Sequence, residues 1–184
     1  MIKKNKSVTL LELMISLSVI SVMVLSFYGI DNLSRNQVLN SDRRAKVQNE
    51  LSYILEHMSK YVHRSIGNNI IASNRAIQAA GSGFQVRVDF NSIPTPSNFT
   101  DDAWITYSYS GSTLSVACSG TGCPFASETL SSRVTVFTPT IGDSGSSIEV
   151  DLEGLYDPAK AEERLTNPHV VMKTKMFCNS CSTN

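Results

Sequence analysis

The sequence predicts an α+β fold in which one long N-terminal helix packs on an antiparallel β-sheet domain. Three observations lead to this prediction. An uncharged apolar run lies near the N-terminus, a segment with helical periodicity and no proline follows it, and the rest of the 184 residues contains runs with the period-two alternation of strands. A helix and a sheet that each have one apolar face can bury those faces against each other.

The first 30 residues form a short basic leader followed by a segment long enough to cross a membrane. Lys3, Lys4 and Lys6 precede a stretch, Leu13–Ile30, of 18 residues without a charge, which is near the lower limit for a spanning helix. A basic start keeps the N-terminus in the cytoplasm and exports the remainder. A cleaved secretory signal is the competing interpretation, but its apolar core is shorter and Ser26–Gly29 is a poor cleavage site. We therefore expect residues 8–30 to form a single membrane span.

Glu12 stands at the start of this apolar segment. A charge at the centre of a membrane helix costs roughly 2.5–3.5 kcal/mol, and less toward the helix ends. This cost predicts that the Glu12 carboxylate has a partner.

The helix is expected to continue from about Val8 to about Ile66, with residues 31–66 as its amphipathic part. Gly29 and the polar pair Asp31–Asn32 are a weak point where a bend would cost least. Gly67–Asn69 is a predicted helix stop. The apolar face is formed by Val47, Leu51, Ile54, Leu55, Met58, Tyr61, Val62 and Ile66.

Residues 67–184 are expected to form an extracytoplasmic, sheet-rich domain whose single antiparallel sheet packs on the amphipathic half of the helix. One short helical turn is expected around Ala159–Arg164. The predicted strands are Phe84–Phe90, a hairpin over Ala103–Cys118 that turns at Ser110–Ser112, Arg133–Thr138, Ser147–Leu152 and His169–Phe177.

The four cysteines favour disulfides, because an exported chain usually meets an oxidising compartment. Three connectivities are possible, and local pairing of Cys118 with Cys123 and of Cys178 with Cys181 is favoured. A four-thiolate zinc site and a redox-active Cys-x-x-Cys are the alternatives. We expect no metal and no other cofactor.

The charge balance and the polar residues exclude several functional classes. The chain has 16 basic and 16 acidic residues, which gives no reason to predict direct nucleic-acid binding. His57, His63 and His169 have no accompanying catalytic constellation and are expected to be surface or packing residues. Trp104, Tyr107 and Tyr109 are expected in the core rather than on a binding face. The sequence therefore does not predict an enzyme.

The run Ser7-Val8-Thr9-Leu10-Leu11-Glu12 resembles the N-terminal processing motif of type IV pilins and type II secretion pseudopilins. The resemblance covers roughly the first 60 residues. It implies that a prepilin peptidase cuts between Ser7 and Val8 and that Val8 is N-methylated. It also implies that Glu12, the fifth residue from the cut, attracts the N-terminal ammonium of a neighbouring subunit. The sequence departs from the family pattern at Ser7, where the family nearly always has glycine, and at Val8, where phenylalanine or methionine is common.

The size of the domain after residue 66 resembles that of larger minor subunits, the PilW-like minor pilins and the J-type pseudopilins. The expected partners are the prepilin peptidase, other pilin or pseudopilin subunits and the inner membrane. The alternative is a membrane-anchored extracytoplasmic binding domain that never polymerises.

Overall fold

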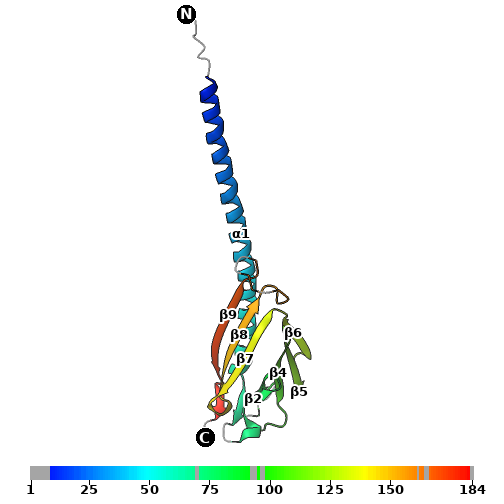
Figure 1. Ribbon diagram of the computed structural model, residues 1–184. Helices are drawn as coiled ribbons and strands as arrows, with labels where there is room; N and C mark the ends of the chain where they lie inside the picture. The colour runs from blue at the N-terminus through cyan, green and yellow to red at the C-terminus, as the bar shows by residue number, and fades with distance from the viewer. Residues whose placement is uncertain are drawn as a thin grey trace, which may run out of the picture.

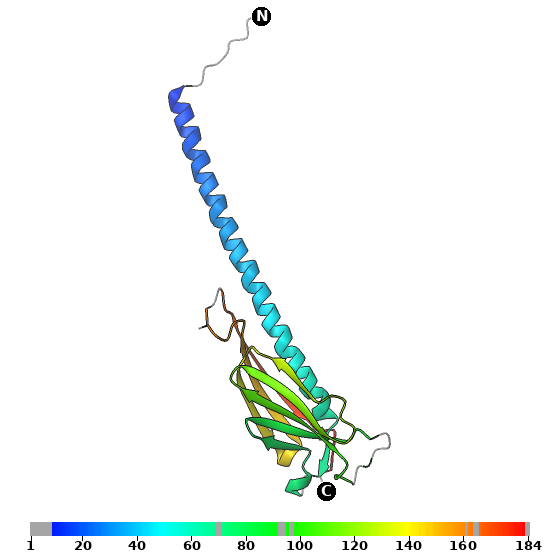
Figure 2. The same ribbon diagram turned by 90° about the vertical axis from the view of Figure 1, so that its right-hand side faces the viewer.

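Helix α1 (Leu10–His63) projects far beyond a sheet domain that is built on its C-terminal half (Figure 1). The computed structural model describes residues 9–68, 71–91, 95, 98–160, 162–163 and 166–182. Figure 2 shows the strands lying along one side of the helix, with the chain's C-terminal region at the end of the domain farthest from the N-terminus. The predicted α+β fold, a long helix packed on antiparallel sheets, is confirmed.

Helix α1 runs without interruption through the expected weak point. Gly29 and Asp31 both lie within the helix, and Asp31 pairs with Arg35 one turn later at 2.9 Å. A glycine in a helix costs only about 1 kcal/mol relative to alanine, too little to break a helix of 54 residues. Thr9 caps the helix, and Val8, where we expected it to begin, lies outside the described residues.

The predicted helix stop at Gly67–Asn69 is wrong by several residues, since the helix ends at His63. The hydroxyl of the buried Ser65 donates to the Val62 carbonyl at 2.6 Å, so it satisfies one of the last free carbonyls of the helix. Gly67 belongs to strand β1 instead, where a Cβ atom would lie 2.4 Å from the Ala76 backbone nitrogen. This glycine permits a close backbone approach, and Asn69 lies outside the described residues.

The strands form two antiparallel sheets and a parallel pair, whereas we expected a single antiparallel sheet. The five-stranded sheet has the order β2-β3-β4-β5-β6, the three-stranded sheet has the order β7-β8-β9, and β1 pairs in parallel with β10. The elements are β1 (Ile66–Asn68), η1 (Ala72–Asn74), β2 (Ile77–Ala80), β3 (Gly83–Val88), β4 (Ala103–Ser110), β5 (Thr113–Gly120), β6 (Ser127–Ser131), β7 (Val134–Gly142), η2 (Asp143–Gly145), β8 (Ser147–Leu155), β9 (His169–Phe177) and β10 (Ser180–Ser182).

Each predicted strand is present with shifted ends, apart from His169–Phe177, whose bounds agree. The predicted hairpin turns at Gly111–Ser112 between β4 and β5. Strands β1, β2, β6 and β10 were not predicted. The described part of Ala159–Arg164 contains turns and an isolated bridge rather than the expected helical turn, and Arg164 lies outside the described residues. The buried Asn167 side chain bonds the backbone of Asp157 there and shapes the loop without a helix.

The core lies between the amphipathic half of α1 and the two sheets. The buried residues of the helix are Val47, Leu51, Ile54, Met58, Tyr61 and Val62, all of them on the predicted apolar face. They meet side chains of both sheets, among them Phe84, Tyr107, Val134, Ile148 and Leu152.

A polar contact at the edge of this core fixes the helix to the chain between the sheets. The Glu50 carboxylate accepts a hydrogen bond from Ser131 Oγ at 2.5 Å and pairs with Arg133 Nη1 at 2.5 Å. Ser131 ends β6 and Arg133 precedes β7, so one helix carboxylate contacts the connection between the two sheets.

Candidate functional site: the N-terminal half of helix α1

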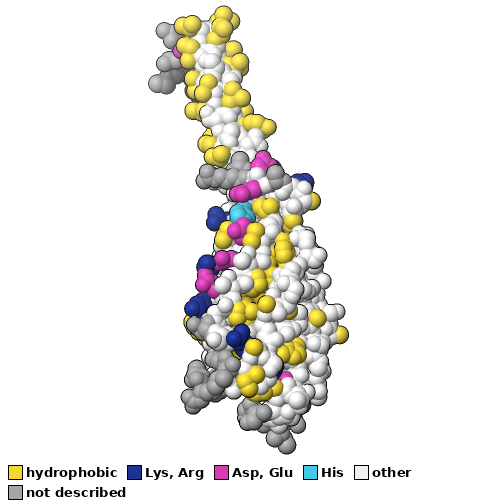
Figure 3. All heavy atoms as spheres, turned by 60° about the horizontal axis from the view of Figure 1, so that its bottom comes forward, with side chains coloured by type: hydrophobic (Ala, Val, Ile, Leu, Met, Phe, Trp, Pro, Cys, Tyr) yellow, Lys and Arg dark blue, Asp and Glu magenta, His cyan; other side chains and the backbone are white. Residues whose placement is uncertain are grey.

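The first half of α1 exposes its apolar side chains on every side. Its large hydrophobic residues between Leu10 and Ile30 are 48–80% exposed. The most apolar window of the helix has a mean hydropathy of 2.2, and none of it is buried, so α1 is long and apolar enough to cross a membrane. Figure 3 shows hydrophobic side chains covering the projecting part of the helix and charged side chains gathered on the domain. This surface needs lipid or other helices to cover it.

Serine side chains do not interrupt the apolar surface, because their hydroxyls bond to the helix itself. Ser16, Ser21 and Ser26 each donate to the carbonyl four residues earlier at 2.7–2.8 Å. Ser18 donates to the Ile15 carbonyl at 2.8 Å. A hydroxyl satisfied in this way can enter a membrane or a helix bundle without leaving a hydrogen bond unmade.

Glu12 lies in the first turn of α1, where it forms a capping box with Thr9. Glu12 Oε2 accepts from the Thr9 backbone N–H at 2.9 Å and from Thr9 Oγ1 at 3.0 Å. The Glu12 N–H donates in return to Thr9 Oγ1 at 3.3 Å. Two free donors at the helix start are thereby satisfied, and the negative charge sits at the positive end of the helix dipole. The carboxylate thus has local partners within its own chain.

The spacing of Thr9 and Glu12 is a sequence signal for this contact, although only Glu12 was predicted as a site residue. Thr9-x-x-Glu12 before an apolar run matches the capping-box pattern. Both bonds end on Glu12 Oε2, and within the described residues Oε1 accepts no hydrogen bond. One carboxylate oxygen therefore remains available to a further donor. Ser7 and Val8 lie outside the described residues.

The four cysteines form two local disulfides, Cys118–Cys123 and Cys178–Cys181. None of the four is a free thiol in this pairing, whereas zinc binding would require thiolates. The second disulfide joins Cys178, which follows β9, to Cys181 in β10. It lies beside the end of α1, where Cys178 Sγ is 3.1 Å from the Ser65 carbonyl oxygen. It therefore holds the C-terminal strand against the residues that leave the helix.

The three histidines lie at separate places in the domain. His57 Nδ1 is 3.0 Å from Tyr107 Oη, His63 Nδ1 is 2.9 Å from the Phe177 carbonyl, and His169 Nε2 is 3.1 Å from Glu153. Across the described ranges, no group of three His, Cys, Asp or Glu side chains could hold a metal ion.

The expectation that the three aromatic residues of β4 lie in the core holds fully only for Tyr107, which is 0% exposed. Trp104 and Tyr109 are half-buried. Tyr109 donates its hydroxyl to the Thr135 carbonyl at 2.8 Å and so links the two sheets.

A buried charged pair, Arg87 and Asp102, lies beside the loop that follows β3. The Arg87 guanidinium lies between the rings of Phe99 and Trp104, with its central carbon 4.9 and 4.7 Å from their centroids. Asp102 is 7% exposed, and neither of its carboxylate oxygens has a hydrogen-bond partner among the described residues. Burial raises the pKa of Asp102 to about 6, against the opposing attraction of Arg87.

Comparison with known protein families matches residues 2–28 to the prokaryotic N-terminal methylation motif. No curated protein and no solved structure gives a significant match. The matched residues include the Thr9–Glu12 capping box and most of the exposed apolar helix, and they fit a single-pass inner-membrane anchor that carries a C-terminal domain. Over residues 2–28 the chain is therefore similar to pilin-type proteins, structural subunits that a prepilin peptidase processes.

Proposed function

We propose that the protein is a minor subunit of a type IV pilus or a type II secretion pseudopilus, of the PilW-like or J-type kind. It is a structural protein whose N-terminal helix resides first in the inner membrane and then enters the helical core of a filament. The observation that carries this proposal is the uncovered apolar half of α1, which begins with a carboxylate that keeps one oxygen free.

A filament core supplies what this helix lacks. Neighbouring helices would cover the exposed side chains, and the N-terminal ammonium of an adjacent subunit would donate to Glu12. A buried charge is tolerated when it is paired and hydrogen-bonded. Thr9 contributes to this arrangement, because its two bonds to Oε2 hold the carboxylate at the helix end and leave Oε1 free for a partner.

The proposal divides the chain into four functional parts. Residues 1–7 are the leader, residues 8–30 the membrane and assembly helix, residues 31–66 its amphipathic continuation and residues 67–184 the extracytoplasmic domain. The prepilin peptidase cuts between Ser7 and Val8, and Val8 is then N-methylated. The match of residues 2–28 to the methylation motif supports this processing.

A membrane-anchored binding domain that does not polymerise is the second candidate. It would use the same apolar helix as an anchor and the same sheet domain outside the membrane. It needs neither a leader that is cut before residue 8 nor a carboxylate at Glu12, so the processed N-terminus and the Glu12 contact distinguish the two functions.

The test compares Glu12→Gln with wild type and with Asp31→Asn, an exposed carboxylate farther along the same helix. Mass spectrometry of all three should find Val8 as the N-terminus with an added methyl group. The amount of Glu12→Gln protein in sheared filaments, relative to the amount in the inner membrane, should fall. Breaking a buried charge pair typically costs about 3–5 kcal/mol. Asp31→Asn should assemble normally.

Two results would contradict the proposal. An intact Met1 start, or cleavage after the apolar run, would exclude prepilin processing. Normal incorporation of Glu12→Gln would exclude the assembly contact and favour the membrane-anchored domain.

A further inference from the structure

Strand β9 forms an open edge of the three-stranded sheet. Figure 1 shows it bordering one side of the domain, and among the described strands it pairs only with β8. The Cys178 N–H donates to the Ser146 carbonyl at 2.8 Å, which sets the alternation of the β8–β9 ladder. The N–H and C=O groups of Val171, Lys173 and Lys175 therefore point away from β8. Within the described residues these outward groups have no hydrogen-bond partner.

Helix α1 runs beside this edge and forms a second wall. Ser52 Oγ donates to Met172 Sδ at 3.8 Å, and His63 Nδ1 lies 2.9 Å from the Phe177 carbonyl oxygen. The two contacts are about 16–17 Å apart both along the helix and along the strand, so α1 and β9 run side by side in the same direction. Ser59 lies on the same flank of the helix between them and is half-buried. Because the serines are small, this flank leaves room for the side chains of a chain that lies beside β9.

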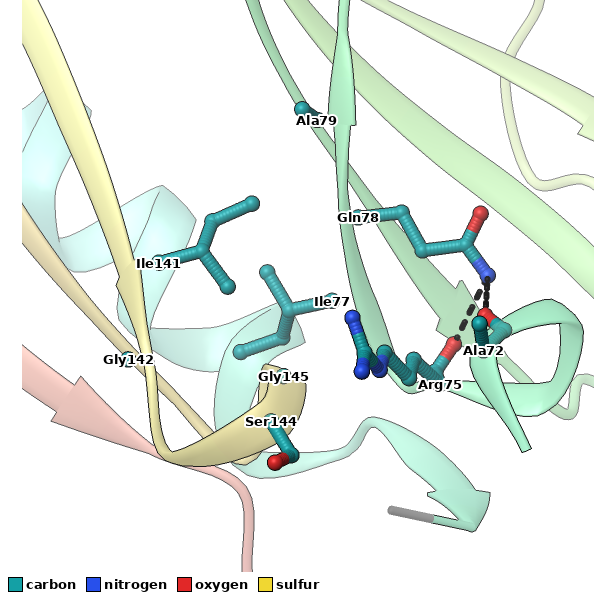
Figure 4. Close-up of a pocket in the computed structure, with 9 residues that line it drawn as sticks. All are labelled: Ala72, Arg75, Ile77, Gln78, Ala79, Ile141, Gly142, Ser144 and Gly145. Atoms are coloured by element: carbon teal, nitrogen blue, oxygen red, sulfur yellow. Dashed lines mark hydrogen bonds between the residues drawn. The ribbon is translucent and has the colours of Figure 1, made fainter. Parts of the chain in front are cut away.

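Two other sheet edges are less open to an added chain. Figure 4 shows the turn at Gly145 lying against Ile77 of β2, and a Cβ added to this glycine would lie 2.7 Å from the carbonyl oxygen of the buried Ile77. Strand β7 contains Pro139, which has no N–H to donate. Strand β9 therefore offers a longer continuous row of donors and acceptors than either of these edges.

The side chains along the β9 edge set the chemistry of a partner. Val171 and Phe177 are large hydrophobic residues that are 57% and 49% exposed. Lys173 is already neutralised by two carboxylates of β8, at 2.5 and 3.1 Å. Lys175 forms no ion pair with the described part of the chain, and its ammonium lies 5.2 Å from the centroid of the Phe177 ring. The row thus presents an apolar residue at each end and one uncompensated cation between them.

This charge argues against pairing with a second copy of the chain. Lysine at a sheet edge opposes indiscriminate strand pairing. Two copies aligned through β9 would place lysine opposite lysine, and like charges directly opposite each other are destabilising. A carboxylate opposite Lys175 would instead be attracted to it.

We propose that the edge of β9 binds an extended acidic segment of another protein as an added antiparallel strand. The backbone of the segment pairs with Val171, Lys173 and Lys175. Its carboxylate faces Lys175, apolar side chains lie beside Val171 and Phe177, and small side chains face α1. Strand addition, in which backbone bonds give affinity and alternate side chains give specificity, is an established way to recognise peptides. The binding belongs to the folded domain and does not depend on assembly of α1 into a filament.

The test uses the full-length protein in a non-ionic detergent. The probe is the peptide acetyl-Val-Thr-Glu-Thr-Thr-Thr-Val-amide, in which the glutamate is placed to face Lys175. At saturating peptide, hydrogen exchange of the backbone amides of residues 171, 173 and 175 should slow at least about tenfold. Exchange of residues 170, 172 and 174, which already bond to β8, should not change. The same peptide with lysine in place of glutamate should bind roughly three- to tenfold more weakly.

Five variants examine the site. Lys175→Gln should bind the two peptides equally, and Lys175→Glu should prefer the lysine peptide. Val171→Pro should abolish binding, because it removes an outward N–H without touching the bonds to β8, whereas Val171→Ala should keep most of it. Lys46→Gln, which changes an exposed lysine on α1, is the matched control and should bind as wild type does. Circular dichroism checks that each variant is folded.

The proposal is overturned if wild type does not bind the glutamate peptide, or if folded Val171→Pro binds it as well as Val171→Ala does. It is also overturned if Lys175→Glu keeps the preference for glutamate, or if the peptide protects other amides instead. Protection of residues 171, 173 and 175 without peptide, together with a dimer in sedimentation, would overturn it in favour of a second copy of the chain.

Discussion

Replacing Asp102 by asparagine should stabilise the protein at neutral pH and leave its stability unchanged in acid. Asp102 is buried beside Arg87, and its carboxylate forms no hydrogen bond with the part of the chain that the structure describes. Burial raises the pKa of Asp102 to about 6, Arg87 lowers it in part, and Asp89 and Asp101 raise it further. Asparagine has nearly the same shape but cannot ionise, so the substitution removes the net cost of the buried charge, which is the cost of burial less the attraction of Arg87.

The sign of the effect follows from the two protonation states. The pKa of Asp102 in the folded protein, about 6, is above its ordinary value of 3.8, so the folded state holds this proton more tightly than the unfolded state. The free energy of unfolding therefore falls as the pH rises from about 4 to about 6 and stays low above that. The difference between the two pKa values corresponds to roughly 3 kcal/mol. For a chain of this size, this free-energy difference corresponds to a change in Tm on the order of 6–12 °C.

The assay measures Tm of wild type and Asp102→Asn in the same detergent at intervals from pH 4 to pH 8. The two curves should coincide near pH 4 and separate above pH 6, with the variant more stable. Asp42→Asn, an exposed carboxylate on α1, should follow the wild-type curve. A difference that is constant with pH, or a variant that is less stable at pH 7.5, would refute the raised pKa of Asp102.

Three further predictions concern the helix start, the contact between helix and sheets, and the turn between β7 and β8. Thr9→Val should cost about 1 kcal/mol of helix stability, because the helix loses its cap. This loss should be measurable as faster amide hydrogen exchange in the first turn. Thr9→Ser, which keeps the hydroxyl, should behave as wild type. Glu50→Gln should lower the free energy of unfolding by roughly 1–3 kcal/mol, because it leaves Arg133 without its ion-pair partner. An unchanged urea midpoint would show that this contact adds no stability. Gly145→Ala should lower the free energy of unfolding by on the order of 1–3 kcal/mol, because it combines a positive φ with a Cβ placed against the Ile77 carbonyl. A variant with the same Tm as wild type would contradict this close approach.

The features that depend on local periodicity could be predicted from the sequence. The apolar face of α1 repeats every three or four residues from Val47 to Val62, and the same residues are buried. The strand His169–Phe177 contains β-branched and aromatic residues and ends before Cys178, so its bounds were predictable.

The features that depend on distant contacts could not be predicted. Strand β10, Ser180–Ser182, has no strand propensity of its own and is extended because it pairs with β1 beside a disulfide. Strand β2 contains two alanines and takes its conformation from the ladder with β3. The division into two sheets depends on how strands of both sheets, β3 and β6 of one and β8 and β9 of the other, pack against the same helix.

The candidate site also contains residues that sequence patterns reveal, and other notable residues of the domain are brought together only by the fold. Glu12 is recognisable from the run around it, and Thr9 was equally readable from the spacing of the capping box. The buried pair of Arg87 and Asp102 was not readable, since its burial depends on rings contributed by Phe99 and Trp104.

The unbroken course of α1 has a mechanical consequence. At 1.5 Å per residue its 54 residues form a rod about 80 Å long, with no proline at which it could fold. The core holds the far end of this rod from Val47 to Val62, and the near end lies at Glu12. A push along the axis or a rotation about it, applied at the first turn, is therefore delivered to both sheets with little loss. Because the core fixes both sheets to the C-terminal half of this helix, a displacement or rotation of that half carries the domain with it.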